Sequence, residues 1–211
     1  MKDQIDSFLD RKGYNDITEL CQIMASCNAD KSALVDKARH NYTPLYHLLF
    51  NQFRNNSFNI FELGISSGAS IRGWLQYFPN SLIFAADINP QSRVNDSRVK
   101  CFVCDQRVDT SVSAMWLSSE LSDNMFDIIV DDGEHTYLSN RTFILNSFHK
   151  LNPGGIYIIE DVRSDQISQF KSMVEELKTK YSLTYGEVIS LPFSDDSWDN
   201  NLCILIKRYE I

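Results

Sequence analysis

Five short apolar runs follow one another between residues 58 and 161, and each of them ends in glycine or aspartate. The segments between the runs are long enough to form a helix each. Strands that alternate with helices in this way form a parallel sheet with helices on both faces. The runs are FNIFELG, SLIFAAD, VKCFVCD, MFDIIVDD and GGIYIIED. The pattern therefore predicts an α/β fold.

The two ends of the chain differ from this middle part. Residues 1–57 have apolar side chains at helical spacing, with a proline where a helix would begin. Near the other end, residues 186–193 and 202–209 are separated only by a polar loop, so we expect an antiparallel hairpin at the sheet edge. We predict a helical N-terminal appendage (residues 1–57) and a main domain (residues 58–211).

Composition excludes several classes of partner. The net charge is −8 and no basic patch is visible, which argues against nucleic acid as a partner. The five cysteines have no repeated spacing, and the first residues, MKDQIDSFLD, lack the apolar run of a signal peptide. No stretch is apolar enough to cross a bilayer. We therefore expect a reduced, cytoplasmic protein without membrane contact, while a homo-oligomer through the N-terminal appendage stays open.

The first apolar run continues into a turn that contains two glycines. Gly64 and Gly68 let the backbone approach a ligand closely before the next helix begins. A nicotinamide dehydrogenase would have GxGxxG here, whereas these glycines are four residues apart and Glu62 precedes them. A carboxylate at that point repels a pyrophosphate but suits a cationic sulfonium and its amino group. The turn therefore favours a sulfonium ligand.

Two further acids end the next two predicted strands. Asp87 lies 19 residues beyond Gly68, where an acceptor can bind both hydroxyls of a ribose. Asp105 ends the third strand, where it can accept a hydrogen bond from an adenine amino group. One acid at a strand end is equally well explained as turn chemistry. Glu62, Asp87 and Asp105 together place acids at the ends of three successive strands. This arrangement indicates a ligand, because open α/β sheets bind ligands at this edge.

The fourth run continues into a segment, residues 131–135, that contains three carboxylates and an imidazole. His135 can act as a general base at neutral pH, since imidazole titrates in that range. An aliphatic hydroxyl is too weak an acid for histidine alone, so a divalent cation would help to deprotonate it. Glu160 and Asp161 end the neighbouring strand, and their oxygens could converge with those of Asp132 on one hard cation such as Mg²⁺.

The motifs ELGISSG, AADINP and Asp-Asp-Gly-Glu-His resemble those of class I S-adenosylmethionine methyltransferases, over about residues 58–209. The resemblance implies a Rossmann-like sheet of seven strands, mostly parallel, with a C-terminal antiparallel hairpin, and it implies S-adenosylmethionine as the cofactor. Ser66 departs from the class, which usually has glycine there. The cofactor-binding residues are then Glu62, Gly64, Ser66, Gly68, Asp87, Asp105, Gln106 and Asp131, of which the last also serves to orient its neighbours.

The segment 131–135 and the pair Glu160-Asp161, together with Asp30-Lys31 and residues 40–46, are similar to the metal-dependent sugar O-methyltransferases of macrolide biosynthesis, the mycinamicin and macrocin type. This resemblance implies Mg²⁺-assisted methyl transfer to a hydroxyl of a sugar or glycosylated small molecule. It makes His135 the general base and Asp132 a second catalytic residue. The implied metal ligands are Asp132, Glu160 and Asp161, and residues 30–46 would border the acceptor.

Several alternatives stay open at this point. Another small-molecule O- or N-methyltransferase, a nicotinamide- or nucleotide-binding protein of Rossmann type, and a cofactor-binding subunit without activity all fit parts of the pattern. His135 could instead cap a helix. Because the chain is short, we expect it to lack the large acceptor-binding or oligomerising domain of longer relatives. The loop 194–201 contains two aspartates and Trp198, and we expect it to form a wall beside the acceptor.

Overall fold

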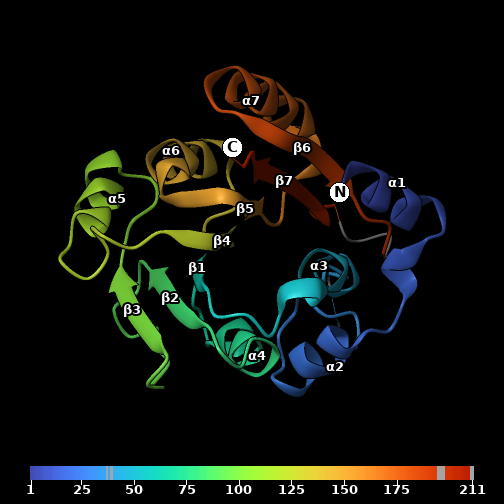
Figure 1. The fold of residues 1–211 in the computed structure, drawn as a ribbon, viewed down its shortest axis with the longest axis horizontal. Coiled ribbons are helices and arrows are strands. Elements are labelled where there is room, and N and C mark those ends of the chain that lie inside the picture. The colour runs from blue at the N-terminus through green and yellow to red at the C-terminus, as the bar shows by residue number, and fades with distance from the viewer. Residues whose placement is uncertain (37, 39, 194–197, 210–211) are drawn as a thin grey trace.

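Seven strands form one sheet in the order β3-β2-β1-β4-β5-β7-β6 (Figure 1) in the computed structural model, which describes residues 1–36, 38, 40–193 and 198–209. Six strands are parallel, and β7 runs antiparallel to its neighbours β5 and β6. The predicted Rossmann-like sheet with a C-terminal hairpin is therefore confirmed. The strands are β1 (Asn59–Leu63), β2 (Leu82–Asp87), β3 (Val99–Val103), β4 (Phe126–Asp131), β5 (Leu151–Ile159), β6 (Leu183–Ser190) and β7 (Asn201–Lys207).

Helices cover both faces of the sheet (Figure 1). On one face lie α5 (Asp109–Trp116), α6 (Tyr137–Ser147) and α7 (Ile167–Lys180). On the other lie α4 (Ala69–Tyr77) and three helices from the N-terminal part of the chain: α1 (Lys2–Asp10), α2 (Glu19–Ser26) and α3 (Thr43–Phe50). Short 3-10 helices span Gly13–Asn15, Asn51–Phe53, Phe148–Lys150 and Ser164–Gln166.

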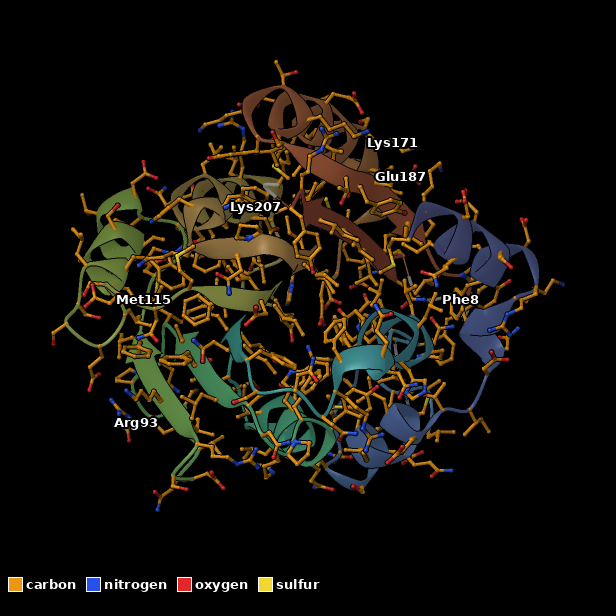
Figure 2. All side chains as sticks on the ribbon, viewed as in Figure 1. Phe8, Arg93, Met115, Lys171, Glu187 and Lys207 are labelled. Carbon is orange, nitrogen blue, oxygen red and sulfur yellow. The ribbon has the colours of Figure 1, made fainter. Side chains whose placement is uncertain are left out.

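The apolar runs explain why the central strands are buried on both sides. Neighbouring residues of a strand point to opposite faces, so a strand buried on both faces needs apolar residues at every position. In β1, Ile60 belongs to the core beneath the N-terminal helices, while Phe61 packs against Trp116 and Phe143 on the other face. Side chains fill the space between the ribbons on both sides of the sheet (Figure 2).

The N-terminal part of the chain contains three α-helices, α1 to α3, as the helical spacing predicted, and these helices share a core with the sheet. Leu20 and Met24 of α2 and Leu45 of α3 belong to the same buried cluster as Ile60 of β1. A side chain at Gly73 of α4 would collide with the Met24 sulfur, 2.2 Å from the ideal Cβ position, so the two helices pack closely. A domain boundary at residue 57 stays a prediction.

Strand β5 begins three residues earlier than the sequence pattern suggested. The pairing with β4 shifts register after Phe126 and Leu151, and the irregular stretch contains Pro153 and Gly154. Proline cannot donate a ladder hydrogen bond, and Gly154 has a φ of 80°, so both are suited to such an irregular position. Among the described helices, none combines the length and the hydropathy that crossing a membrane requires.

Candidate active site

The strand order brings the predicted acidic residues to one edge of the sheet. Strand β4 lies between β1 and β5, with Leu63 opposite Asp131 and Asp131 opposite Ile159. The residues that follow these strands therefore meet at the carboxyl ends of neighbouring strands. Asp132 follows β4, and Glu160 and Asp161 follow β5.

A first cavity of about 290 Å³ lies at the carboxyl ends of β1, β2, β3 and β4. Four of the residues assigned to cofactor binding line it: Gly64, Asp87, Asp105 and Gln106. The remaining lining residues are Leu63, Ile88, Cys104, Arg107, Gly133 and Glu134. The lining combines apolar side chains with a few polar and charged groups, which is the usual character of a site for a small ligand.

Asp87 fixes the glycine-containing turn as well as facing the first cavity. Its Oδ2 atom accepts hydrogen bonds from the backbone N–H groups of Ile65 and Ser66, each at 2.9 Å. Its Oδ1 atom accepts from the N–H of Asn89 at 2.8 Å. A carboxylate oxygen can accept more than one hydrogen bond, so Asp87 can hold the turn and still bind a hydroxyl.

Asp105 and Gln106 approach the first cavity from the residues after β3. The Arg107 guanidinium binds Asp105 through two hydrogen bonds of 2.9 and 2.8 Å, and it lowers the pKa of that carboxyl. Gln106 is buried; its Nε2 donates to Asp131 and its Oε1 accepts from the N–H of Glu134. Gln106 thus ties the end of β3 to the loop after β4.

Glu62 and Asp131 were assigned to the cofactor, but the structure places both behind the cavity walls. Glu62 is fully buried and accepts hydrogen bonds from Ser70 Oγ and Trp74 Nε1. Asp131 is also fully buried and accepts from Asn140 Nδ2 at 3.0 Å; burial raises the pKa of Asp131 to about 6. Both carboxylates therefore hold neighbouring side chains in place through hydrogen bonds.

A second cavity, of about 560 Å³, adjoins the first. The two share Gly64, Asp87 and Gly133, so one ligand could extend from the first into the second. Ser66 lines the second cavity, and Gly68 caps the start of α4 with a φ of 76°. The N-terminal part of the chain contributes Asn28, Asp30, Val35, Asp36 and Ala38, and the strand ends contribute Asp132, His135 and Asp161.

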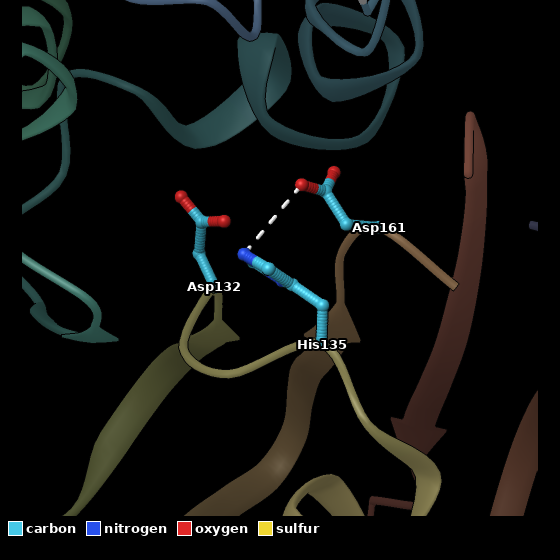
Figure 3. Close-up of side chains that lie close together, drawn as sticks. All are labelled: Asp132, His135 and Asp161. Atoms are coloured by element: carbon cyan, nitrogen blue, oxygen red, sulfur yellow. Dashed lines mark ion pairs between the residues drawn. The ribbon is translucent and has the colours of Figure 1, made fainter. Parts of the chain in front are cut away.

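Asp132, His135 and Asp161 lie together on the wall of the second cavity (Figure 3). Each offers one ligand atom, and these atoms all lie within 4.8 Å of one another. His135 Nε2 is 3.8 Å from Asp161 Oδ2. Two carboxylates and an imidazole at this separation can bind one divalent cation. Alternatively, the two carboxylates can orient the imidazole so that it acts as a base.

Glu160 does not belong to this group of ligand atoms, although the sequence placed it among the metal ligands. It is 2% exposed and accepts hydrogen bonds from Tyr46 Oη and Lys31 Nζ, each at 2.7 Å. A part in metal binding therefore stays a prediction for Glu160, and both its oxygens already have buried donors.

Lys31 is the residue that the sequence reasoning missed. Its Nζ, on a side chain 1% exposed, lies 2.5 Å from Asp132 Oδ2, 2.7 Å from Glu160 Oε2 and 3.6 Å from Glu62 Oε1. Burial by itself would lower the pKa of Lys31, but the three carboxylates outweigh it and raise the pKa well above the ordinary value. The only signal in the sequence was the place of Lys31 within a segment of family resemblance.

Among the described residues, the carboxylates outnumber the ammonium at this edge of the sheet. Glu62, Asp132 and Glu160 surround the ammonium of Lys31, and Asp161 lies close to Asp132. Burial raises the pKa of Asp132 to about 7 and that of Glu160 well above its usual range, even though the ammonium opposes both shifts. A divalent cation would offset the excess negative charge, so the residues present fit a metal ion.

Unusual backbone conformations concentrate around the second cavity. Among the described residues other than glycine, five have a positive φ, and four of these, Asn28, Ser66, His135 and Asp161, line this cavity. Such conformations cost free energy for residues with a Cβ atom and tend to be retained where function needs them. His135 Nδ1 is also buried without a hydrogen-bond partner in the described part of the chain.

The expected acceptor walls are only partly described. His40 and Tyr42, which the sequence placed beside the acceptor, are buried, and Tyr42 Oη donates to Asp161 Oδ1 at 2.7 Å. Of the loop 194–201, residues 194–197 lie outside the described residues, while Trp198 stacks on the Arg163 guanidinium at 4.6 Å.

Comparison with known proteins supports the resemblance. No protein-family model matches the chain. It is 31% identical over 146 residues to the 8-demethyl-8-alpha-L-rhamnosyl tetracenomycin-C 2'-O-methyltransferase of Streptomyces olivaceus, covering 65% of this chain and 37% of that protein. It is 31% identical over 136 residues to the mycinamicin VI 2''-O-methyltransferase of Micromonospora griseorubida, covering 58% and 32%. The chain thus matches about a third of the length of these curated relatives.

The fold is also that of a methyltransferase of the mycinamicin pathway. The structure superposes on that of MycE in complex with Mg and SAH with a TM-score of 0.74, over 92% of this chain and 56% of the other, at 21% sequence identity. The expected resemblance to sugar O-methyltransferases of the mycinamicin type, on a class I methyltransferase fold, is confirmed.

Proposed function

We propose that this chain is an S-adenosylmethionine-dependent O-methyltransferase that acts on a hydroxyl of a sugar or of a glycosylated small molecule. The observation that carries the proposal is the position of Asp132, His135 and Asp161 on the wall of a polar cavity that adjoins a nucleoside-sized one. The curated relatives named above, which methylate sugar hydroxyls, support the same chemistry.

The first cavity is the proposed site of the nucleoside. Asp87 would accept hydrogen bonds from the ribose hydroxyls, while Asp105 and Gln106 would lie beside the adenine. The turn from Gly64 to Gly68 would hold the methionine part, because its glycines allow close backbone approach. S-adenosylmethionine supplies the methyl group as a sulfonium, and the carbon–sulfur bond breaks as the carbon–oxygen bond to the acceptor forms.

Asp132 and Asp161 are the proposed metal ligands. Glu160 would contribute negative charge close to them, because it shares the ammonium of Lys31 with Asp132. Mg²⁺ bound there would lower the pKa of the acceptor hydroxyl. The resemblance to structures that contain Mg supports the choice of metal. Within the part of the chain that the structure describes, Asp132 and Glu160 share the ammonium of Lys31, and this excess of carboxylates supports it independently.

His135 is the proposed general base. Its Nδ1 is buried, so Nε2, which faces Asp161 Oδ2 at 3.8 Å, is the atom available to take the hydroxyl proton. The imidazolium that results would lie between the carboxylates of Asp132 and Asp161, and these would stabilise its charge.

Methyl transfer from labelled S-adenosylmethionine to a panel of acceptors tests the proposal. The panel contains rhamnosides and other glycosides with free hydroxyls, and amines of similar size. We expect transfer to at least one glycoside, loss of transfer after chelation with EDTA, and recovery when Mg²⁺ is added. Transfer to an amine that survives EDTA would instead identify a metal-independent N-methyltransferase.

A further inference from the structure

Three buried side chains from one N-terminal segment contact the carboxylates at the strand ends. Lys31 donates to Asp132 and Glu160, Tyr42 to Asp161, and Tyr46 to Glu160. The segment also closes on itself, because the backbone N–H of Tyr42 donates to the carbonyl of Lys31 at 3.0 Å. One short stretch of chain therefore reaches all three residues that the sequence assigned to the metal.

Each donor occupies one oxygen of the carboxylate that it contacts. Lys31 Nζ binds Oδ2 of Asp132, and Tyr42 Oη binds Oδ1 of Asp161. The other oxygen of Asp161, Oδ2, is the one that faces His135. Tyr42 Oη also accepts from the backbone N–H of Asp161 at 3.3 Å, at a residue whose φ is 53°. The hydroxyl thus fixes both the side chain and the unusual backbone of Asp161.

The burial of these donors separates them from the acceptor. The side chains of Tyr42 and Tyr46 are 0% exposed, and neither they nor Lys31 lines either cavity. The three side chains therefore contact the carboxylates without forming part of either cavity wall.

We propose that Lys31, Tyr42 and Tyr46 are positioning residues. They hold both oxygens of Glu160 and one oxygen each of Asp132 and Asp161, and they leave Oδ1 of Asp132 and Oδ2 of Asp161 directed toward one divalent cation. The inference rests on the metal site of the proposed function. Side chains that hydrogen-bond to metal ligands orient those ligands, and their removal commonly weakens metal binding by about 10- to 100-fold.

Binding of Mn²⁺ to the purified chain tests this, with free Mn²⁺ followed by its electron paramagnetic resonance signal. Mn²⁺ is suitable because it takes the same oxygen ligands as Mg²⁺. Tyr42→Phe removes one hydroxyl and keeps the ring. Tyr77→Phe is the matched control, because Tyr77 is equally buried in the same core and its hydroxyl bonds to His47 and, within the described residues, to none of the strand-end carboxylates. Asp161→Asn tests that the ion binds at this site.

We expect the Mn²⁺ dissociation constant to rise at least about tenfold in Tyr42→Phe, to stay within twofold of the wild type in Tyr77→Phe, and to rise most in Asp161→Asn. Calorimetry should give the same affinity for S-adenosylhomocysteine in all four proteins, which a general structural effect of Tyr42→Phe would not preserve. Wild-type affinity for Mn²⁺ in either Tyr42→Phe or Asp161→Asn overturns the inference.

Failure of the inference and failure of the proposed function give different results. A wild-type protein that binds S-adenosylhomocysteine but no Mn²⁺ overturns the positioning of a metal site and leaves methyl transfer in place. The opposite result is that the protein binds Mn²⁺ with the expected dependence on Tyr42 but does not bind S-adenosylhomocysteine. That result would support the inference and contradict the proposed methyltransferase function.

Discussion

The Nζ atom of Lys31 lies 2.5 Å from Oδ2 of Asp132, across 101 positions of sequence; the Lys31 side chain is buried, and Asp132 is partly exposed to the second cavity. The same ammonium bonds to Glu160. An ion pair in such surroundings contributes little net stability, but removing one partner leaves a buried charge without compensation. This relationship makes Lys31 a sensitive position for both folding and metal binding.

Replacement of the buried ammonium should destabilise the protein strongly. Lys31→Met leaves Glu160, Asp132 and Glu62 without their counter-charge, so we expect the free energy of unfolding to fall by about 3–5 kcal/mol in urea titrations without metal. Lys2→Met is the control, since Lys2 pairs with Asp6 and Glu187 at the exposed surface. Its unfolding midpoint should match the wild type, and a similar loss in both variants would contradict the account.

Asp87→Ala should weaken binding of S-adenosylhomocysteine by about 1–3 kcal/mol, the cost of removing a charged acceptor from buried hydroxyls. Part of the loss comes from the turn, whose N–H groups at Ile65 and Ser66 lose their acceptor. Calorimetry gives the affinity directly. Asp96 also accepts from a backbone N–H but lies outside both cavities, so Asp96→Ala should bind normally. Unchanged affinity in Asp87→Ala would remove Asp87 from the cofactor site.

His135→Ala should lower the turnover number by about 10²- to 10⁴-fold, as expected for loss of a general base. Affinity for S-adenosylhomocysteine should stay close to that of the wild type, because His135 lines only the second cavity. His149→Ala serves as the control, since His149 is exposed and distant from both cavities. If His135→Ala lost cofactor binding together with turnover, the histidine would be structural.

Gly133→Ala should reduce affinity for S-adenosylhomocysteine and leave the fold intact. An added Cβ at Gly133 would lie 1.8 Å from Gln106 Oε1, so Gln106 must leave its place on the wall of the first cavity. Overpacking of this kind costs about 1–3 kcal/mol. Gly186→Ala at the sheet edge, where the nearest atoms are flexible side chains at 3.1 Å, should bind S-adenosylhomocysteine normally. Equal affinity in the two variants would count against the first cavity as the cofactor site.

The sequence predicted the parts of the site that depend on local pattern. Apolar runs define strands, their alternation with helices predicts a parallel sheet, and Gly64, Asp87 and Asp105 lie just after or at the ends of those strands. These features need no knowledge of distant contacts.

The contacts of the N-terminal segment could not be predicted in this way. Lys31 meets Asp132 only after the segment has packed on the sheet, and no periodicity in the sequence records that contact. The direction of Glu160 was accessible in principle, since neighbouring residues at a strand end point to opposite sides. Glu160 therefore faces Lys31 and Tyr46, while Asp161, with its φ of 53°, turns toward His135.

Calorimetric titration of the purified chain with S-adenosylhomocysteine, before and after chelation and with Mg²⁺ restored, tests the central claim most directly. The account predicts binding of one molecule per chain that is weakened in Asp87→Ala and kept in His135→Ala. Absence of binding in the presence and in the absence of Mg²⁺ would contradict it and leave a Rossmann-like domain without an assigned ligand.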